Sequence, residues 1–382
     1  MGLAQTIATT SSEPATDRGA RATASATSSL PGRIPLVADR VEARFRSLLG
    51  AERLRWHGVD ATLADPLDVL EGAVLDGGKR LRPTFCYWGY AATGADPDGE
   101  PGAALVDDAG LAFELLHAFA LLHDDVMDGA DTRRGRTTPH IAWADRHADE
   151  GWRGESRRFG EGVAILVGDL AHVHADALLT GAPEPALGVW RDLRVELMLG
   201  QYLDVVGTAR GHATGEQARL IARMKSGRYT VERPLQLGAA LADPLAGPAV
   251  FDALARYGEP IGIAFQLRDD VLGAFGDAAT VGKPVGDDLR EGKPTPMLAI
   301  ARERADQRQA DVLAMVGTPG LTDDGVAAIQ QVVVDTGALA AIEDEIADLR
   351  RQAEAAVHHG PLPGDVRDAL VDLAWFLTDR AY

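Results

Sequence analysis

The sequence predicts an all-α protein that forms one large domain from about Ile34 onward. Apolar residues recur at three- and four-residue spacings, whereas the alternation that is typical of strands is scarce. Glycine and proline gather between these periodic stretches, and no short internal repeat is present. The chain has 382 residues, of which 46% are hydrophobic, so it can bury a large core.

Each expected helix is a stretch of helical periodicity. The expected helices cover 36–50, 66–75, 80–93, 103–128, 158–180, 184–208, 213–241, 248–275, 295–316, 322–357 and 364–380. Clusters of glycine and proline separate many of these helices, at 94–102, 181–185, 244–248, 317–320 and 360–364. The range 322–357 should break near Gly337, and the charged stretch at about 148–158 is expected to be a long loop without an assigned function.

Residues 1–33 differ from the rest of the chain. They are rich in Ser, Thr, Ala and Gly and lack apolar periodicity, so we expect a disordered tail before the domain at 34–382. The first residues, MGLAQT, fit a myristoylation pattern, and the segment weakly resembles a transit peptide. An unstructured tail explains the composition better than either signal.

Charge and cysteine content exclude several classes of protein. The net charge is −19, so nucleic acid and anionic membranes are not expected partners. The only cysteine, Cys86, allows neither an internal disulfide framework nor a multi-cysteine zinc site. No apolar stretch approaches the roughly 18–20 residues of a membrane-spanning helix. These features predict a cytoplasmic protein.

Lysine is rare and occurs in a consistent setting. Of the 38 basic residues only four are lysine: Lys79, Lys225, Lys283 and Lys293. Each lies beside glycine or serine, where a phosphate group can approach the backbone closely. A lysine ammonium is a compact charge that suits a single phosphate oxygen. We therefore interpret these lysines as phosphate contacts, although four ordinary surface lysines would also fit the count.

Three aspartates end the apolar helix at 103–128. Asp124 and Asp128 lie one helical turn apart, and Asp125 flanks them. Their mutual repulsion would be relieved by a divalent cation, and hard oxygen ligands without a thiolate favour Mg²⁺, or Mn²⁺. The preceding turns are apolar, so the cluster is expected to line a cavity rather than to form a solvated helix end.

A second acidic cluster ends the helix at 248–275. It contains Asp269 and Asp270, with Gln266 one turn before Asp270. Either cluster alone is a moderate signal, because paired aspartates arise by chance. Two clusters, each at the end of a long apolar helix, predict facing helices that hold metal between them.

Anion-binding groups accompany both clusters. Arg133 and Arg134 follow the first cluster directly, and GGKRLRP (77–83) offers Lys79 and Arg82 at an expected helix start. His117 lies two turns before Asp124 on the same helix face, where it can donate a hydrogen bond. The chain has no P-loop and no arrangement of Ser, His and Asp that indicates nucleophilic catalysis.

Five motifs together resemble the trans-isoprenyl diphosphate synthases, also called polyprenyl synthetases, over roughly residues 35–380. They are GGKRLRP (77–83), HAFALLHDDVMDGADTRRG (117–135), KSGRYT (225–230), FQLRDDVLGAFGD (265–277) and GKPVGDDLREGKPT (282–295), in the order and spacing of that family. The resemblance implies a single helical bundle around a deep central cavity, a homodimer, and a catalytic domain at 34–382.

The resemblance also implies roles for individual residues. Mg²⁺ would be bound by Asp124, Asp125, Asp128, Asp269 and Asp270. Isopentenyl diphosphate would be held by Lys79, Arg82, His117 and Arg134. The allylic diphosphate would be held by Arg133, Lys225, Gln266 and Lys283, with Lys293 close by and Ser226 where the family often has threonine. The five aspartates, Arg133 and Lys225 would be the catalytic residues. The third aspartate of the second cluster is missing, because Gly273 stands in its place.

These roles imply a prenyltransferase that ionises the allylic diphosphate, condenses it with isopentenyl diphosphate and eliminates a proton. Family enzymes set product length with the fifth and fourth residues before the first aspartate, here Phe119 and Ala120. One aromatic residue at the fifth position resembles enzymes that make geranylgeranyl diphosphate (C20). A C15 or a longer product is the alternative.

Three other classes of protein fit less well. A metal phosphohydrolase would leave GGKRLRP and the second cluster unexplained. A class I terpene cyclase would carry a late Asn/Ser/Glu metal triad, which is absent from the sequence, and would lack the isopentenyl pocket. A non-catalytic partner subunit would be expected to lose its aspartates, and this chain keeps five.

Overall fold

The computed structural model describes residues 31, 33–210, 214–245, 247–276 and 286–379. Internal contacts divide the chain into Met1–Leu30 and Pro31–Tyr382, and all the described residues belong to the second unit. The tail expected at 1–33 lies almost wholly outside the described residues and stays a prediction.

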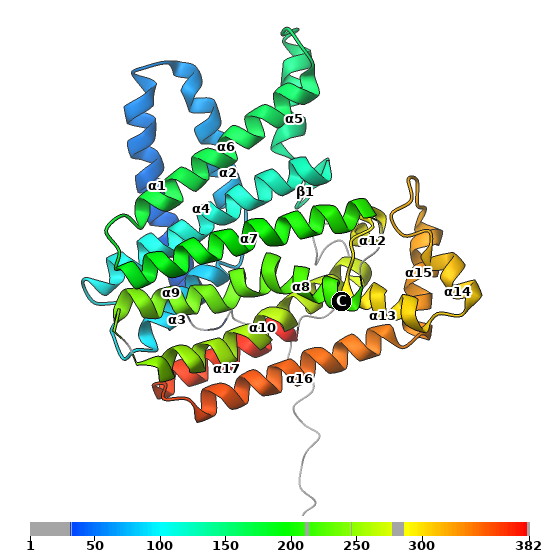
Figure 1. Ribbon diagram of the computed structural model, residues 1–382. Coiled ribbons are helices and arrows are strands. Elements are labelled where there is room, and N and C mark those ends of the chain that lie inside the picture. The colour runs from blue at the N-terminus through cyan, green and yellow to red at the C-terminus, as the bar shows by residue number, and fades with distance from the viewer. Residues whose placement is uncertain (1–30, 32, 211–213, 246, 277–285, 380–382) are drawn as a thin grey trace, which may run out of the picture. The chain divides into compact units, whose positions relative to one another are not determined.

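The expected all-α class is confirmed for the described residues, which form helices and one very short hairpin (Figure 1). The elements are α1 (Ile34–His57), η1 (Ala61–Leu63), α2 (Ala64–Leu75), α3 (Leu81–Ala91), α4 (Gly102–Asp128), β1 (Thr132–Arg133), β2 (Arg136–Thr137), α5 (Pro139–Asp149), α6 (Ser156–Leu178), α7 (Glu184–Arg210), α8 (Gly215–Ala222), η2 (Arg223–Glu232), α9 (Arg233–Ala242), α10 (Pro248–Phe275), α12 (Asp287–Glu291), α13 (Pro296–Arg304), α14 (Gln307–Leu313), α15 (Asp323–Asp335), α16 (Ala338–His359) and α17 (Gly364–Thr378).

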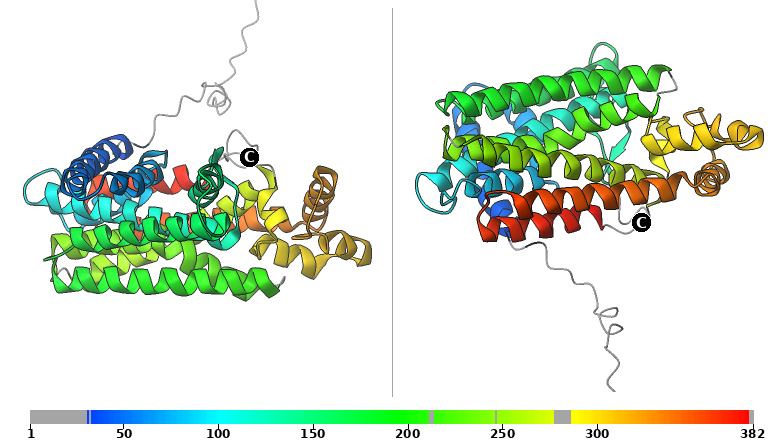
Figure 2. Two further views of the ribbon diagram at one scale, coloured as in Figure 1. Left: turned by 90° about the horizontal axis from the view of Figure 1, so that it is seen from above. Right: turned by 60° about the horizontal axis from the view of Figure 1, so that its bottom comes forward.

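Long helices pack side by side to form the bundle. α4 packs against α3 and α6, α3 packs against α9, and α10 packs against η2 and α16 (Figures 1 and 2). Residues of α4 at three- and four-residue spacing, such as Leu111, Leu115 and Leu122, are buried in this core. The helical periodicity of the sequence therefore corresponds to the faces that the helices bury.

α3 and α9 approach closely because two glycines lie where they cross. A β-carbon on Gly89 would overlap the backbone of Leu235, and one on Gly238 would overlap the carbonyl oxygen of Cys86. Cys86 is fully buried at this crossing, and burial raises the pKa of its thiol to about 12. The close contact leaves no room for solvent beside the only cysteine of the chain.

Three stretches differ from the expectation. Within the expected range 213–241 the described residues are helical from Gly215 onward, but the middle of this stretch, η2, is a π-helix. The range 295–316 divides into α13 and α14 because the Asp306 side chain accepts a hydrogen bond from the backbone of Gln309 and begins a new helix there. α5 was not expected. It packs aromatic rings on α6, with Trp143 and His147 against Phe159, and its sequence lacks the aliphatic periodicity that marks the other helices.

The charged stretch at 148–158 is shorter as a loop than expected. α5 extends into the start of this stretch and α6 into its end, and Trp152 between them packs against His147 and Phe159.

No single helix among the described residues is long and apolar enough to cross a membrane. In that part of the chain, the bent pair α15 and α16 reaches this length and composition when the two helices are taken together.

Candidate active site

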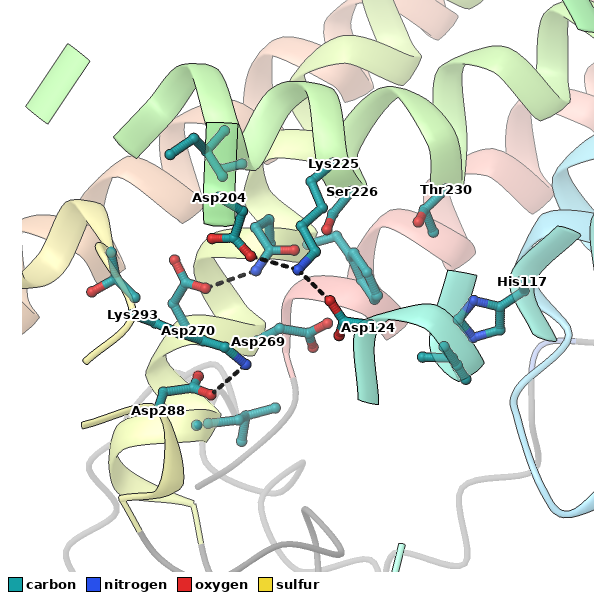
Figure 3. Close-up of a pocket in the computed structure, with 18 of the residues that line it drawn as sticks. His117, Asp124, Asp204, Lys225, Ser226, Thr230, Asp269, Asp270, Asp288 and Lys293 are labelled. Atoms are coloured by element: carbon teal, nitrogen blue, oxygen red, sulfur yellow. Dashed lines mark hydrogen bonds and ion pairs between the residues drawn. The ribbon is translucent and has the colours of Figure 1, made fainter. Parts of the chain in front are cut away.

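A cavity of about 570 Å³ opens between α3, α4, η2, α10 and the segment that joins α12 to α13. It brings together side chains from all five motifs, and Figure 3 labels residues from four of them. The predicted residues that line it are Lys79, Arg82, His117, Asp124, Arg133, Arg134, Lys225, Ser226, Gln266, Asp269, Asp270 and Lys293. These residues come from positions more than 200 apart in the sequence, and the fold places them around one space.

We call the side formed by the end of α4 and the β1–β2 hairpin the first wall. Asp124 is its central carboxylate and has three cationic or amide partners. Lys225 Nζ lies 3.0 Å from Asp124 Oδ1, Gln201 donates to the same oxygen at 2.8 Å, and Arg133 lies 3.4 Å from Oδ2. Lys225 also binds Asp204 at 2.6 Å. Asp124 therefore faces the cavity within a fixed network (Figure 3).

The hairpin after α4 orients the two arginines. Arg133 pairs with Arg136, so Arg134 and Gly135 form the turn between them, and both have positive φ, 53° and 73°. Arg133 Nε then donates to Asp125 Oδ1 at 2.6 Å, while Arg134 donates to the carbonyl of Asp76 at 2.7 Å. Two neighbouring arginines are thus held by different parts of the site.

The three aspartates of the first wall have different electrostatic environments. Burial would raise the pKa of Asp124, but Lys225 lowers it below its ordinary value. Burial raises the pKa of Asp125, and Arg133 offsets part of this effect. Burial and the neighbouring Asp124 raise the pKa of Asp128 to about 6. The wall has an excess of negative charge that its own cations do not fully balance.

We call the side formed by the end of α10 and by α12 the second wall. Asp269 and Asp270 line the cavity here, and Gln266 Nε2 donates to Asp270 Oδ1 at 2.7 Å. Burial and the nearby Asp288 raise the pKa of Asp270 well above its usual range. Burial would lower the pKa of Lys293, but Asp288 and Glu291 raise it well above its usual range. Among the described residues, this wall gathers carboxylates around the ammonium of Lys293.

The GGKR turn forms the end of the cavity that lies beside α3. Gly77 and Gly78 have positive φ, 88° and 111°, which glycine adopts without steric cost. Arg80 follows with a φ of 48° and is buried, where it donates to Glu114 at 2.5 Å and to the carbonyl of Val74 at 2.8 Å. This buried contact fixes the turn, and Lys79 beside it lines the cavity.

His117 and Arg82 lie near this turn. Arg82 stacks on the ring of Tyr229 at 4.2 Å, and its Nη2 donates to the hydroxyl of Thr230 at 3.2 Å. Burial and the positive charges of Arg82 and Arg134 hold the pKa of His117 well below its usual value, so its imidazole is neutral. The buried Nδ1 of His117 has no hydrogen-bond partner among the described residues. It can accept or donate a hydrogen bond when a ligand enters.

Lys225 and Ser226 reach the cavity from η2, which is a π-helix. Such wide turns are frequent at functional sites. Close backbone contacts hold η2 on both sides: a β-carbon on Gly200 would lie 2.7 Å from the amide nitrogen of Lys225, and one on Gly227 would lie 3.0 Å from the carbonyl carbon of Gly262. The lysine is therefore anchored by packing of α7 and α10.

Some predicted residues do not line the cavity. Asp125 and Asp128 lie on α4 beside it. Phe119 faces α6 instead, where its ring lies 4.5 Å from that of His123 and 5.0 Å from that of His172, and Ala120 is half-buried next to it. Lys283 lies outside the described residues.

Residues that sequence reasoning missed complete the site. Gln201 and Asp204 come from α7, Thr230 from η2, and Asp288 from α12. Asp288 belongs to the motif GKPVGDDLREGKPT, so its position beside two phosphate-type lysines was an available signal. Gln201 and Asp204 had no comparable signal, because only helix packing brings α7 to Lys225.

The residues fit a hard divalent cation. The cavity is lined by carboxylate oxygens, and the only thiol, Cys86, is buried in the core away from the lining. Within the described ranges, no three His, Cys, Asp or Glu side chains lie close enough to hold a metal by themselves. Mg²⁺ usually binds through one or two carboxylates and completes its shell with water and substrate phosphates. The two walls offer this kind of incomplete shell.

Comparison with known proteins agrees with these features. The family model for polyprenyl synthetase matches residues 66–333. The short chain isoprenyl diphosphate synthase of Methanothermobacter thermautotrophicus is 30% identical over 89% of this chain and 98% of its own length. The geranylgeranyl diphosphate synthase of Mycobacterium tuberculosis is 33% identical over 79% of this chain and 80% of its own. Other relatives of similar identity are named farnesyl or geranylfarnesyl diphosphate synthases.

A solved structure shares the fold along nearly the whole chain. The geranylgeranyl pyrophosphate synthase of Corynebacterium glutamicum, complexed with isoprenyl diphosphate and magnesium, has a TM-score of 0.85 at 37% identity and covers 91% of this chain and 99% of its own. The match of the family model to most of the chain, together with these relatives, shows that the chain belongs to the polyprenyl synthetase family and is a prenyltransferase.

Proposed function

We propose that this prenyltransferase condenses isopentenyl diphosphate with allylic diphosphates and makes geranylgeranyl diphosphate, a C20 product. One observation carries the proposal: two acidic walls and two sets of cationic side chains face one cavity that also has apolar lining. The two cationic sets match two diphosphates, and the apolar part matches two hydrocarbon groups.

The first set would hold isopentenyl diphosphate. Lys79, Arg82 and Arg134 supply positive charge at one end of the cavity, and neutral His117 adds a hydrogen bond. The second set would hold the allylic diphosphate through Arg133, Lys225 and Lys293, with Gln266 beside them. Charge-assisted hydrogen bonds of this kind position phosphates strongly and hold the reacting carbons close together.

The reaction begins when the allylic C–O bond breaks and its electron pair leaves with the diphosphate. Arg133 and Lys225 stabilise the negative charge that develops on this leaving group. Mg²⁺, when bound at the carboxylates, supplies further charge neutralisation as a Lewis acid. Leu121, Phe265 and Leu272 line the cavity and exclude water, which would quench the carbocation.

The double bond of isopentenyl diphosphate then attacks the carbocation and forms the new C–C bond. A proton is lost from the adjacent carbon, and we propose the released pyrophosphate as its acceptor. This assignment agrees with the lining of the cavity, because its two carboxylates outside the acidic walls are already paired: Glu114 with Arg80, and Asp204 with Lys225. The chain then supplies position and electrostatic stabilisation rather than a strong base.

We propose Phe119 as the residue that limits product length. Its ring is fixed between His123 and His172, so a chain that extends along α4 toward α6 would meet a rigid aromatic surface. Farnesyl or longer diphosphates are the alternative products. Relatives of similar identity carry names for different chain lengths, so product analysis has to decide.

We further propose that the enzyme is a homodimer. Large apolar side chains are exposed on α6 and α7, among them Leu166, Val173, Leu199 and Tyr202. Exposed apolar surface of this kind marks protein–protein contact sites. Light scattering of the purified protein should give twice the mass of one chain, and Tyr202→Glu should shift the measured mass toward that of a single chain.

We also propose a cytoplasmic location, which the net charge of −19 and the single buried cysteine support.

Product analysis tests the proposed activity. The purified protein would be incubated with Mg²⁺, isopentenyl diphosphate and, separately, C5, C10 and C15 allylic primers, and the dephosphorylated alcohols would be separated by chromatography. A dominant C20 alcohol is expected. Another single length would overturn the C20 assignment but keep the reaction, whereas no elongation from any primer would overturn the synthase proposal.

A further inference from the structure

In the second wall, a carboxylate from another helix occupies the place where α10 has a glycine. Its helix, α10, supplies Asp269 and Asp270 but has Gly273 one turn after them, where a third carboxylate would be placed on the same face. The structure fills that position from elsewhere in the chain. A β-carbon built on Gly273 would overlap Oδ2 of Asp288 and lie 2.6 Å from its Cγ.

The position of Asp288 is fixed by its own helix. The neighbouring Leu289 is buried in the core, and Arg290 on the other side binds Asp323 at 2.5 Å. Gly286 begins this short helix with a φ of 71°, which turns the chain toward α10. These contacts hold Asp288 against α10, where it lines the same cavity as Asp269 and Asp270.

The two oxygens of Asp288 have different surroundings. Oδ1 lies 3.4 Å from Lys293 Nζ, which also binds Glu291 at 2.7 Å. Oδ2 points at the space above Gly273. Lys293 has Glu291 as another carboxylate partner, so the ion pair with Lys293 does not by itself explain why Asp288 lies at this position. Figure 3 shows Asp288 and Asp270 on the same side of the cavity.

We propose that Asp288 supplies the third carboxylate of the second wall in place of the residue missing at position 273, and that it positions Mg²⁺ or its bound water there. Asp288 is thus a positioning residue for the metal, and glycine at 273 is required so that its carboxylate fits. This inference rests on the proposed function, because it assumes a Mg²⁺-dependent diphosphate site.

Moving the carboxylate tests the proposal. Four proteins would be compared: wild type, Asp288→Ala, the double variant Gly273→Asp/Asp288→Ala, and the matched control Gly273→Asn/Asp288→Ala. The control fills the same space without charge. Thermal unfolding would confirm that all four fold. Calorimetry would then measure the binding of methylenediphosphonate, a diphosphate analogue that is not hydrolysed, across a series of Mg²⁺ concentrations.

Loss of Asp288 should raise the Mg²⁺ concentration needed for half-maximal binding by about 10–100-fold, the usual effect of removing a group that orients a metal site. Saturating Mg²⁺ should restore binding. Gly273→Asp/Asp288→Ala should return the Mg²⁺ requirement to within about threefold of wild type, and the asparagine control should stay defective.

Three results would overturn the inference. The first is an unchanged Mg²⁺ requirement in Asp288→Ala. The second is an aspartate at 273 that performs no better than asparagine. The third is weaker binding that persists at saturating Mg²⁺, as expected if Asp288 only holds Lys293. Absence of Mg²⁺-dependent binding by the wild type would overturn the proposed function as well, which distinguishes the two failures.

Discussion

The first and second walls of the cavity gather carboxylates in different ways. On the first wall one helix, α4, carries Asp124, Asp125 and Asp128, and their cationic partners come from other elements. On the second wall α10 carries only two aspartates, and Asp288 enters from α12 into space that a glycine leaves free. A motif within one helix is therefore readable in the sequence. The motif around Asp288 marks that residue as a candidate, but only packing shows that its carboxylate fills the space beside Gly273 of another helix.

The largest effect is expected at the first wall. Asp124→Asn should reduce turnover by about 10³-fold, because it removes a carboxylate that we propose as a metal ligand and leaves the charge of Lys225 less balanced. The measurement is the steady-state rate with saturating isopentenyl diphosphate and primer. Asp131→Asn, an equal change at an exposed position just before the hairpin, should stay close to wild type. Equal losses of turnover in Asp124→Asn and Asp131→Asn would contradict a specific role of the first wall in catalysis.

Product length should depend on the same helix at a different position. Phe119→Ala should lengthen the product by at least one C5 unit and cost about 3 kcal/mol in the free energy of unfolding, because the buried ring is lost. Phe113→Ala removes the same atoms from α4, but its ring packs on Trp190 of α7 and takes no part in the contact with His172 of α6 that we propose as the limit. This control should lose stability without a change in product length. If Phe119→Ala made a product of unchanged length, this would contradict the proposal that Phe119 limits product length.

At the second wall we expect a smaller effect, on the free energy of unfolding of variants at Gly273 and Asp288. Gly273→Ala would gain about 1 kcal/mol from helix propensity, but its β-carbon meets Asp288 and offsets that gain. In an Asp288→Ala background the gain should reappear, with a coupling free energy of about 1–2 kcal/mol in denaturant unfolding. Gly162→Ala on α6, where a β-carbon meets nothing within 4 Å, should give the same effect in both backgrounds. Additive effects at 273 would show that the two positions do not share space.

The smallest effect concerns pH and the neutral His117. In the folded protein its pKa lies well below 6.5, because the side chain is buried and faces arginines. Unfolding lets it take up a proton below about pH 6.5, so folded-state stability is lost as the pH falls through that value. Between pH 7 and 5.5 the wild type should lose about 1 kcal/mol more than His117→Asn.

Urea unfolding at several pH values measures this difference, and His359→Asn at an exposed position on α16 is the control. Parallel stability curves for wild type and His117→Asn would contradict a neutral His117.

Local patterns in the sequence predicted much of this molecule. Asp124 and Asp128 share a helix turn, and Lys79 lies in a glycine turn, so each could be recognised from neighbouring residues alone. The roles of Asp204 and Gln201 could not be predicted, because Asp204 reaches Lys225 only where Gly200 lets α7 approach the backbone of η2. α5 was not predicted either, because its aromatic contacts with α6 depend on packing and follow no aliphatic spacing in the sequence.

The buried thiol described at the crossing of α3 and α9 has a practical consequence. Cys86 is the only cysteine in the chain, and its burial keeps it protonated and out of reach of alkylating reagents. The natural protein therefore needs no cysteine removal before site-directed labelling. A pair of cysteines introduced on the outer surfaces of α4 and α12 would carry spin labels selectively, and the distribution of distances between the labels would report how far the two walls move when a diphosphate binds.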